Sequence, residues 1–141
     1  MLVGLRKAWS QSVAREEQPE YQAKSLNDGH EPLFHHESLE IYGVALGFME
    51  WFVSRPEAKG FSNRLFRQLD EAGTSVVLNI AEGNGRYAEL DHHRFLQIAQ
   101  SAAVKGAVYL DLAVQRGDMV KTDATVGKEM LRRISAMVAG F

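Results

Sequence analysis

Apolar residues recur at intervals of three or four positions through four long stretches of this chain, which is the spacing of one face of an α-helix. The first stretch stops before Pro56, because the residue preceding a proline disfavours helix. The second starts near Ser62, a residue type that caps helices, and the third ends before Gly117, a residue type common just past a helix. We therefore predict four helices, over about residues 36–54, 62–83, 90–116 and 122–138.

Strand signals are scarce in the sequence. Val76 and Val77 sit inside a helical period, and no turn dipeptide separates two alternating runs. The connections are short, so consecutive helices should lie antiparallel. The predicted fold is therefore all-α, an up-down-up-down antiparallel four-helix bundle over residues 35–141.

Residues 1–34 form an N-terminal extension with a different composition. Residues 15–32 have few core-forming side chains and are typical of a flexible linker. Two alternatives stand for the extension: an untethered tail, or a segment that docks on a partner or on the bundle through Trp9 and its neighbours. Five apolar residues at its start have the spacing of a short amphipathic helix: Leu2, Leu5, Ala8, Trp9 and Val13.

The second and third predicted helices are apolar on two faces. In the second, Phe66, Gly73 and Val77 lie beside the row from Leu65 to Ile80, and the third has the same double pattern. A helix of a monomeric bundle needs one apolar face of about 100°. The extra apolar surface predicts a second partner, most simply another copy of the chain.

Composition narrows the class of protein further. The chain is 45% apolar and 24% charged, has a net charge of −2 and contains no cysteine. Disulfides and cysteine nucleophiles are excluded, and the basic excess of a dedicated nucleic-acid binder is missing. No apolar run approaches the roughly 20 residues that span a bilayer, and the first residues do not follow signal-peptide order. We expect a cytoplasmic protein without membrane contact.

Ser75, Asn79, Glu82 and Arg86 follow one another at spacings of four, three and four. On a helix these intervals put the first three on one face, beside apolar rows, where polar groups must be hydrogen-bonded. One interpretation is a structural polar network in which Arg86 neutralises Glu82. The other is a pole of the bundle that contacts a ligand or RNA.

Lys105 falls on the apolar side of the third helix, opposite about Leu69 or Asp70 in an antiparallel pair. An unpaired buried lysine is costly. The sequence therefore predicts an ion pair of Lys105 with Asp70 or Glu71, buried in the bundle or formed across a subunit boundary.

Metal and enzyme chemistry find little support in the sequence. The neighbours His35 and His36 diverge by about 100° on a helix, so such a pair cannot chelate one ion. No His-x-x-x-His spacing occurs. We expect no metal or other cofactor, and a solvated first turn at His92, His93 and Arg94. Because no set of nucleophile, base and orienting group can be assembled, we expect no enzyme.

A basic group is the remaining candidate site. We predict that Arg64, Arg67, Arg86 and Arg94 converge at one end of the bundle, with Tyr87 as a stacking group for RNA. In an oligomer such a patch is repeated, so a modest charge per chain gains avidity. Acidic residues interspersed among these positions oppose the attraction.

The element Asn79-Ile80-Ala81-Glu82-Gly83-x-Gly85-Arg86 resembles the bacterial four-helix bundle family of 23S rRNA intervening-sequence proteins. The similarity covers about residues 37–120 and implies an up-down bundle that forms a ring-like homopentamer, with a suggested link to ribosomal RNA. The chain departs from the family pattern at Ala88, Ser101-Ala102 and Lys105, where the family has serine, Gly-Ser and glutamate. Other matching segments are Leu39-Glu40-Ile41-Tyr42, Gln68-Leu69-Asp70-Glu71-Ala72 and Phe95-Leu96-x-Ile98-Ala99.

These observations favour a non-enzymatic, homo-oligomeric binding module, pentameric by resemblance and associated with ribosomal RNA or another nucleoprotein. One alternative is a protein-interaction scaffold without a nucleic-acid role, whose partner docks on apolar surface or on residues 1–34. Another is a small-molecule site in the centre of the ring, around Glu82.

Overall fold

The computed structural model describes residues 31–58, 64–86 and 88–140. This part of the chain is helical and contains no strand, which confirms the predicted all-α class. Its four long helices are α3 (Glu40–Val53), α4 (Arg64–Asn84), α5 (Glu89–Gln115) and α6 (Lys121–Ala139). The short 3₁₀ helices η1 (His35–Ser38) and η2 (Pro56–Ala58) flank α3.

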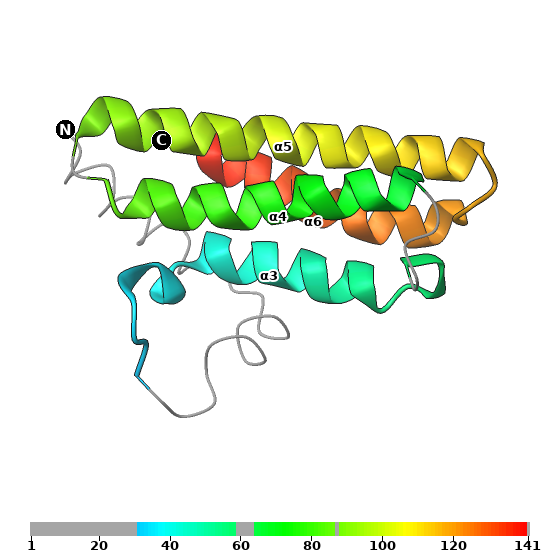
Figure 1. Cartoon of the computed structure of the whole chain (residues 1–141), viewed down its shortest axis with the longest axis horizontal. Helices are drawn as coiled ribbons and strands as arrows, with labels where there is room; N and C mark the ends of the chain where they lie inside the picture. Colours follow the sequence, from blue (N-terminus) through cyan, green and yellow to red (C-terminus); the bar gives the residue numbers. More distant parts are fainter. Residues whose placement is uncertain (1–30, 59–63, 87, 141) are drawn as a thin grey trace.

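Successive helices run antiparallel in one bundle (Figure 1). Helix α3 packs against α4 and α6, and α5 packs against the same two helices. As a result α3 and α5 lie diagonally across the bundle from each other. The predicted up-down-up-down order is confirmed.

The first predicted helix begins later than expected. Leu39 has extended backbone, with φ −83° and ψ 131°, and separates η1 from α3. Local hydrogen bonds close η1 as a turn of its own. The Phe34 N–H donates to the Glu37 carboxylate at 2.8 Å, and the Ser38 hydroxyl donates to the His35 carbonyl at 2.7 Å. Such short-range bonds compete with a continuous helix, and apolar periodicity does not reveal them.

Gly117 ends α5 as predicted. Its φ of +78° is a left-handed conformation that glycine adopts without strain. The Gly117 N–H donates to the Val114 carbonyl at 3.0 Å, and the Asp118 N–H donates to the Ala113 carbonyl at 2.9 Å. These are the two bonds of a Schellman motif. The motif reverses the chain, so that α6 returns along α5.

Stacked aromatic rings fill the core between α3 and α4. The ring centroids of Phe48 and Phe52 lie 6.4 Å apart, and those of Phe52 and Phe66 lie 6.2 Å apart. All three side chains are buried. On the α6 side, Gly127 lies against the Trp51 ring, and a Cβ at this position would clash with carbons of that ring. Glycine is therefore required for α6 to approach α3 this closely.

Some predictions lie outside the described residues. They are the amphipathic helix that includes Trp9, almost all of the linker that follows it, the Ser62 cap and the stacking role of Tyr87. Among the helices that are described, none combines the length and the apolar character that a membrane crossing requires.

Candidate interaction face

Helices α4 and α5 pack closely enough to define their antiparallel register. An added Cβ at Gly83 would lie 3.0 Å from the Phe95 Cβ. An added Cβ at Gly106 would lie 3.8 Å from the Leu69 side chain. Gly83 and Phe95 therefore lie at one level of the pair, and Leu69 and Gly106 lie at another, farther along the bundle.

Among the large apolar side chains that stay exposed on this helix pair, two lie at one level. Leu78 of α4 is 58% exposed, and Ile98, at the same level of α5, is 41% exposed. Beside them the Asn79 Nδ2 donates to the Ser75 carbonyl at 2.8 Å and to the Ser75 hydroxyl at 3.1 Å. We call Ser75, Leu78, Asn79 and Ile98 the α4–α5 face. Exposed apolar side chains rimmed by polar groups are typical of an interaction surface.

Glu82 and Arg86 form a second local pair, nearer the end of α4. The Arg86 Nη2 lies 2.7 Å from the Glu82 Oε2, and both side chains are about half exposed. Within the described residues, neither Ser75 nor Asn79 bonds to this pair. The four residues of the predicted network therefore form two separate pairs, Ser75 with Asn79 inside α4 and Glu82 with Arg86 at its end.

Phe95 brings two arginines together at this end of the bundle. The guanidinium carbon of Arg86 lies 4.9 Å from the centre of the Phe95 ring, and that of Arg94 lies 5.4 Å away. At these distances the ring attracts both cations. The sequence analysis placed Phe95 only in a segment shared with the family and did not predict its contact with two arginines.

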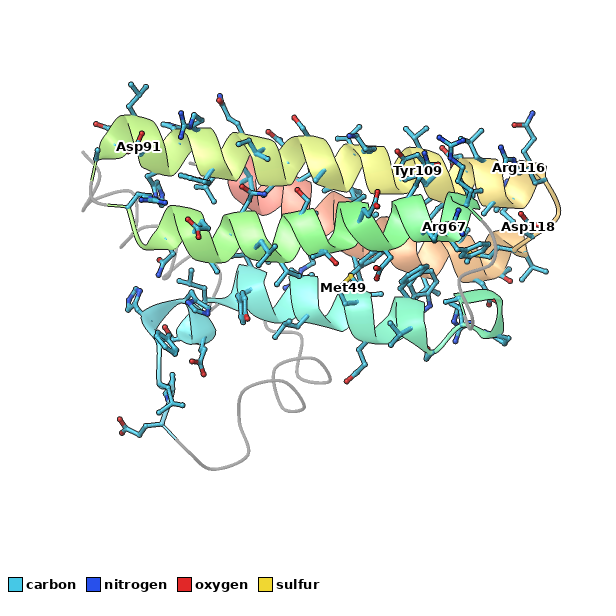
Figure 2. All side chains as sticks on the ribbon, in the orientation of Figure 1. Met49, Arg67, Asp91, Tyr109, Arg116 and Asp118 are labelled. Carbon is cyan, nitrogen blue, oxygen red and sulfur yellow. The ribbon has the colours of Figure 1, made fainter. Side chains whose placement is uncertain are left out.

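The predicted convergence of the basic residues is wrong. Arg64 and Arg67 lie in the first turn of α4, whereas Arg86 and Arg94 lie near its other end. At 1.5 Å per residue, a helix of the length of α4 separates the two groups by about 30 Å. In Figure 2, Arg67 and Asp91 mark these opposite ends of the bundle. One chain thus presents two small basic groups instead of one patch.

Lys105 is exposed, not buried. Its neighbour Gly106 is the residue that faces Leu69, and one position along a helix turns a side chain by about 100°. Among the ion pairs of the described residues, none joins Lys105 to Asp70 or Glu71. The predicted buried pair is therefore not formed within one chain. Pairing across a subunit boundary stays a prediction.

His92 contradicts the predicted solvated first turn of α5. Its side chain is 1% exposed, and its Nδ1 lies 2.8 Å from the Gly83 carbonyl oxygen. A carbonyl only accepts, so Nδ1 is the donor. His92 precedes Leu96 and Ala99 by four and seven positions and lies on the same buried row. This periodicity was the signal that could have found it.

A second histidine holds the end of α4 from the other side. The Asn84 side chain is 5% exposed, and its Nδ2 lies 3.0 Å from the His35 Nδ1. An amide nitrogen donates, so this histidine nitrogen accepts. The last turn of α4 is thus fixed to both η1 and α5. In the described part of the chain, no group of three or more potential metal ligands occurs.

A buried ion pair links α3 to α6. The Arg133 Nη2 lies 2.5 Å from the Glu40 Oε2, and the two side chains are only 12% and 4% exposed. These residues are 93 positions apart, and no local spacing indicates their contact. The pair fixes the relative position of two helices that sequence reasoning treated separately.

The structure defines an antiparallel four-helix bundle with an exposed apolar face on its α4–α5 pair. Residues 37–140 match the family described as 23S rRNA-intervening sequence protein, and the chain belongs to this family. It is similar to a solved structure from Bacteroides thetaiotaomicron, a protein of unknown function from the S23 ribosomal protein family. The TM-score is 0.64 at 18% identity, over 70% of this chain and 94% of that chain, which shows a common fold. No curated protein matches.

Proposed function

We propose that this chain is a non-enzymatic helical binding module that assembles with copies of itself through the α4–α5 face. The observation that carries the proposal is the exposure of Leu78 and Ile98 at one level of the helix pair. Fully burying a side chain of this type contributes about 1.5–3 kcal/mol. The family resemblance implies that five copies form a ring.

Polar groups of the same surface support this proposal. The two bonds to Ser75 use the Asn79 amide nitrogen, and the Asn79 Oδ1 accepts no hydrogen bond from the described residues. This oxygen is available to a donor on a neighbouring copy. Lys105 lies two turns beyond Ile98 on α5 and is exposed, so it can reach an acidic residue such as Glu71 across the same boundary.

Replacing Ile98 by glutamate tests the proposed assembly. A buried unpaired carboxylate is costly, so Ile98→Glu should lower the molar mass of the particle in light scattering. Val53→Glu is the matched control, because Val53 is similarly exposed but lies on α3, diagonally across the bundle. The proposal fails if both variants keep the mass of the parent. It also fails if both lose it equally.

Replacing Asn79 by alanine tests whether this residue contributes to the fold or to the assembly. Asn79→Ala should lower the melting temperature or break the oligomer, because it removes both bonds to Ser75 and the free acceptor. An unchanged melting curve together with an unchanged mass would show that Asn79 contributes to neither the fold nor the assembly.

Association with ribosomal RNA or another nucleoprotein is the second candidate function. It is favoured by the family description and by the grouping of Arg86 and Arg94 around Phe95. A ring would repeat this group and raise the affinity through avidity. Against it stands the net charge of −2.

Purification from the native cell at low salt, followed by sequencing of the nucleic acid that comes with the protein, tests this candidate. RNA that leaves in high salt and is lost in Arg86→Gln/Arg94→Gln would support it. Arg64→Gln/Arg67→Gln at the other end of α4 is the control. A nucleic-acid-free oligomer would instead favour a protein-interaction scaffold.

A further inference from the structure

A groove with a volume of about 600 Å³ runs between α5 and α6. Its floor consists of Ala103, Ala107 and Leu131, and Ala136 and Ala139 continue the apolar lining along α6. Alanine side chains leave room between the helices that larger side chains would fill. The groove is thus a shallow apolar channel on the surface of a single chain.

Hydrogen bonds and an ion pair brace the two helices along this groove. The Gln100 Nε2 donates to the Ser135 hydroxyl at 3.2 Å, and the Lys128 Nζ lies 2.6 Å from the Asp111 Oδ1. The lining of α6 extends from Thr125 to Ala139, which is about 21 Å at 1.5 Å per residue. The channel is therefore preformed and has the length of a short helix.

The sequence of the N-terminal extension offers a ligand of matching length and character. Leu2, Leu5, Trp9 and Val13 are spaced by three, four and four positions, which places them in one narrow stripe of a helix. Residues 2–13 would span about 17 Å as a helix. An amphipathic helix in an apolar groove is a common mode of recognition, and a tryptophan is a frequent anchor.

We propose that residues 2–13 of the same chain dock as a helix in the groove between α5 and α6, with Trp9 over the alanine floor. The intervening residues 14–30 can extend to about 55 Å, whereas α5 is about 40 Å long, so the groove lies within reach. Attachment to the same chain gives the segment a high effective concentration.

The charged side chains around the groove give no net attraction of one sign, so the docking depends on apolar contacts. Lys128, Glu129 and Arg132 line the groove and carry both signs, so they attract neither a purely basic nor a purely acidic segment. The docking should therefore depend little on salt. It leaves the α4–α5 face uncovered and does not rest on the proposed self-association.

Contact quenching of a bimane dye by tryptophan tests the proposal in the full chain. The chain contains no cysteine, so Ala136→Cys gives one labelling position in the groove. Gln115→Cys, at the exposed end of α5 and away from both the groove and the α4–α5 face, is the matched control position. Trp9→Ala should raise the emission at position 136 several-fold and leave the emission at position 115 unchanged. Equal emission with and without Trp9 at position 136 would overturn the proposal.

Mixed chains distinguish the chain's own segment from that of another copy. Labelled Ala136→Cys chains that carry Trp9→Ala are refolded with an excess of unlabelled chains that retain Trp9. Emission that stays high supports docking within one chain. Quenching in the mixture would show that a neighbouring copy supplies the segment, which contradicts the proposal.

Limited trypsin digestion gives an independent readout without a dye. Arg6 and Lys7 lie within the docking segment, so cleavage there should be slow in the parent chain. Ala136→Glu, which places a charge in the groove, should speed this cleavage several-fold, whereas Gln115→Glu, outside the groove, should not. Equal cleavage rates in the parent and in Ala136→Glu would show that the groove does not hold the segment.

Discussion

The buried ion pair between α3 and α6 gives the sharpest stability prediction. In Arg133→Met, the Glu40 carboxylate, which is 4% exposed, loses the guanidinium that lies 2.5 Å away. Breaking a buried ion pair from one side costs about 3–5 kcal/mol. Small domains have a free energy of unfolding of about 5–15 kcal/mol, so this loss is a large part of the total. We expect the melting temperature to fall by roughly 10–20 °C.

Urea unfolding of the full chain, followed by circular dichroism at one fixed chain concentration, measures the effect. Arg132→Met is a matched control on the same helix. It breaks the Arg132–Glu129 pair, whose side chains are more than 60% exposed, and should cost less than about 1 kcal/mol. The double variant Glu40→Leu/Arg133→Met should recover most of the loss, because no charge is left buried. Equal effects of Arg133→Met and Arg132→Met would show that the Glu40–Arg133 pair stabilises the chain no more than an exposed pair does.

Three further substitutions test separate features of the fold. Gly127→Ala should destabilise the chain by about 1–3 kcal/mol, with a change in the near-UV signal of Trp51, since a Cβ would meet that ring; unchanged unfolding would contradict the close approach. His92→Ala should cost about 2–4 kcal/mol in urea unfolding, because it leaves a cavity and removes the donor to the Gly83 carbonyl; a cost near zero would show a solvated side chain. Burial, aided by the charge of Glu37, raises the pKa of Tyr42 in the folded chain. The neutral Tyr42 side chain therefore contributes fully to stability below the unfolded pKa of about 10, and this contribution is lost as the pH rises through the folded pKa. The free energy of unfolding should therefore fall less steeply between pH 9 and 12 in Tyr42→Phe than in the parent chain. Identical pH profiles of the two chains would contradict a raised pKa of Tyr42.

Apolar periodicity and helix stop signals predicted the four helices and their order. Gly117 was recognisable because glycine ends helices, and the structure gives it the expected left-handed conformation. The predicted level of Lys105 beside Leu69 was also correct within one residue, since Gly106 is the residue that faces Leu69. Most of the fold could therefore be predicted from sequence patterns that repeat within one or two helical turns.

Contacts between distant segments could not be predicted in this way. The bonds of His35 with Asn84 and of Glu40 with Arg133 depend on how helices meet in space, and no spacing in the sequence encodes them. The error on His92 has another cause. Two adjacent histidines in the first turn of a helix suggested exposed side chains, whereas the helical period places His92 on the row that faces the core.

The convergence of the four arginines failed for a geometric reason. Residues at the two ends of a single helix are about 30 Å apart when that helix has the length of α4, whatever the order of the other helices. A helical net drawn from the sequence would have separated Arg64 and Arg67 from Arg86. The same net would have placed Leu78 on the outer side of α4, where the structure shows it exposed.

Native mass spectrometry of the full chain measures whether the chain associates with copies of itself. We expect an oligomer, whose mass is five times the 15.8 kDa of one chain if the ring implied by the family resemblance forms. We further expect that Ile98→Glu shifts the mass toward that of the single chain. A parent chain that remains at 15.8 kDa at micromolar concentration would contradict self-association through the α4–α5 face.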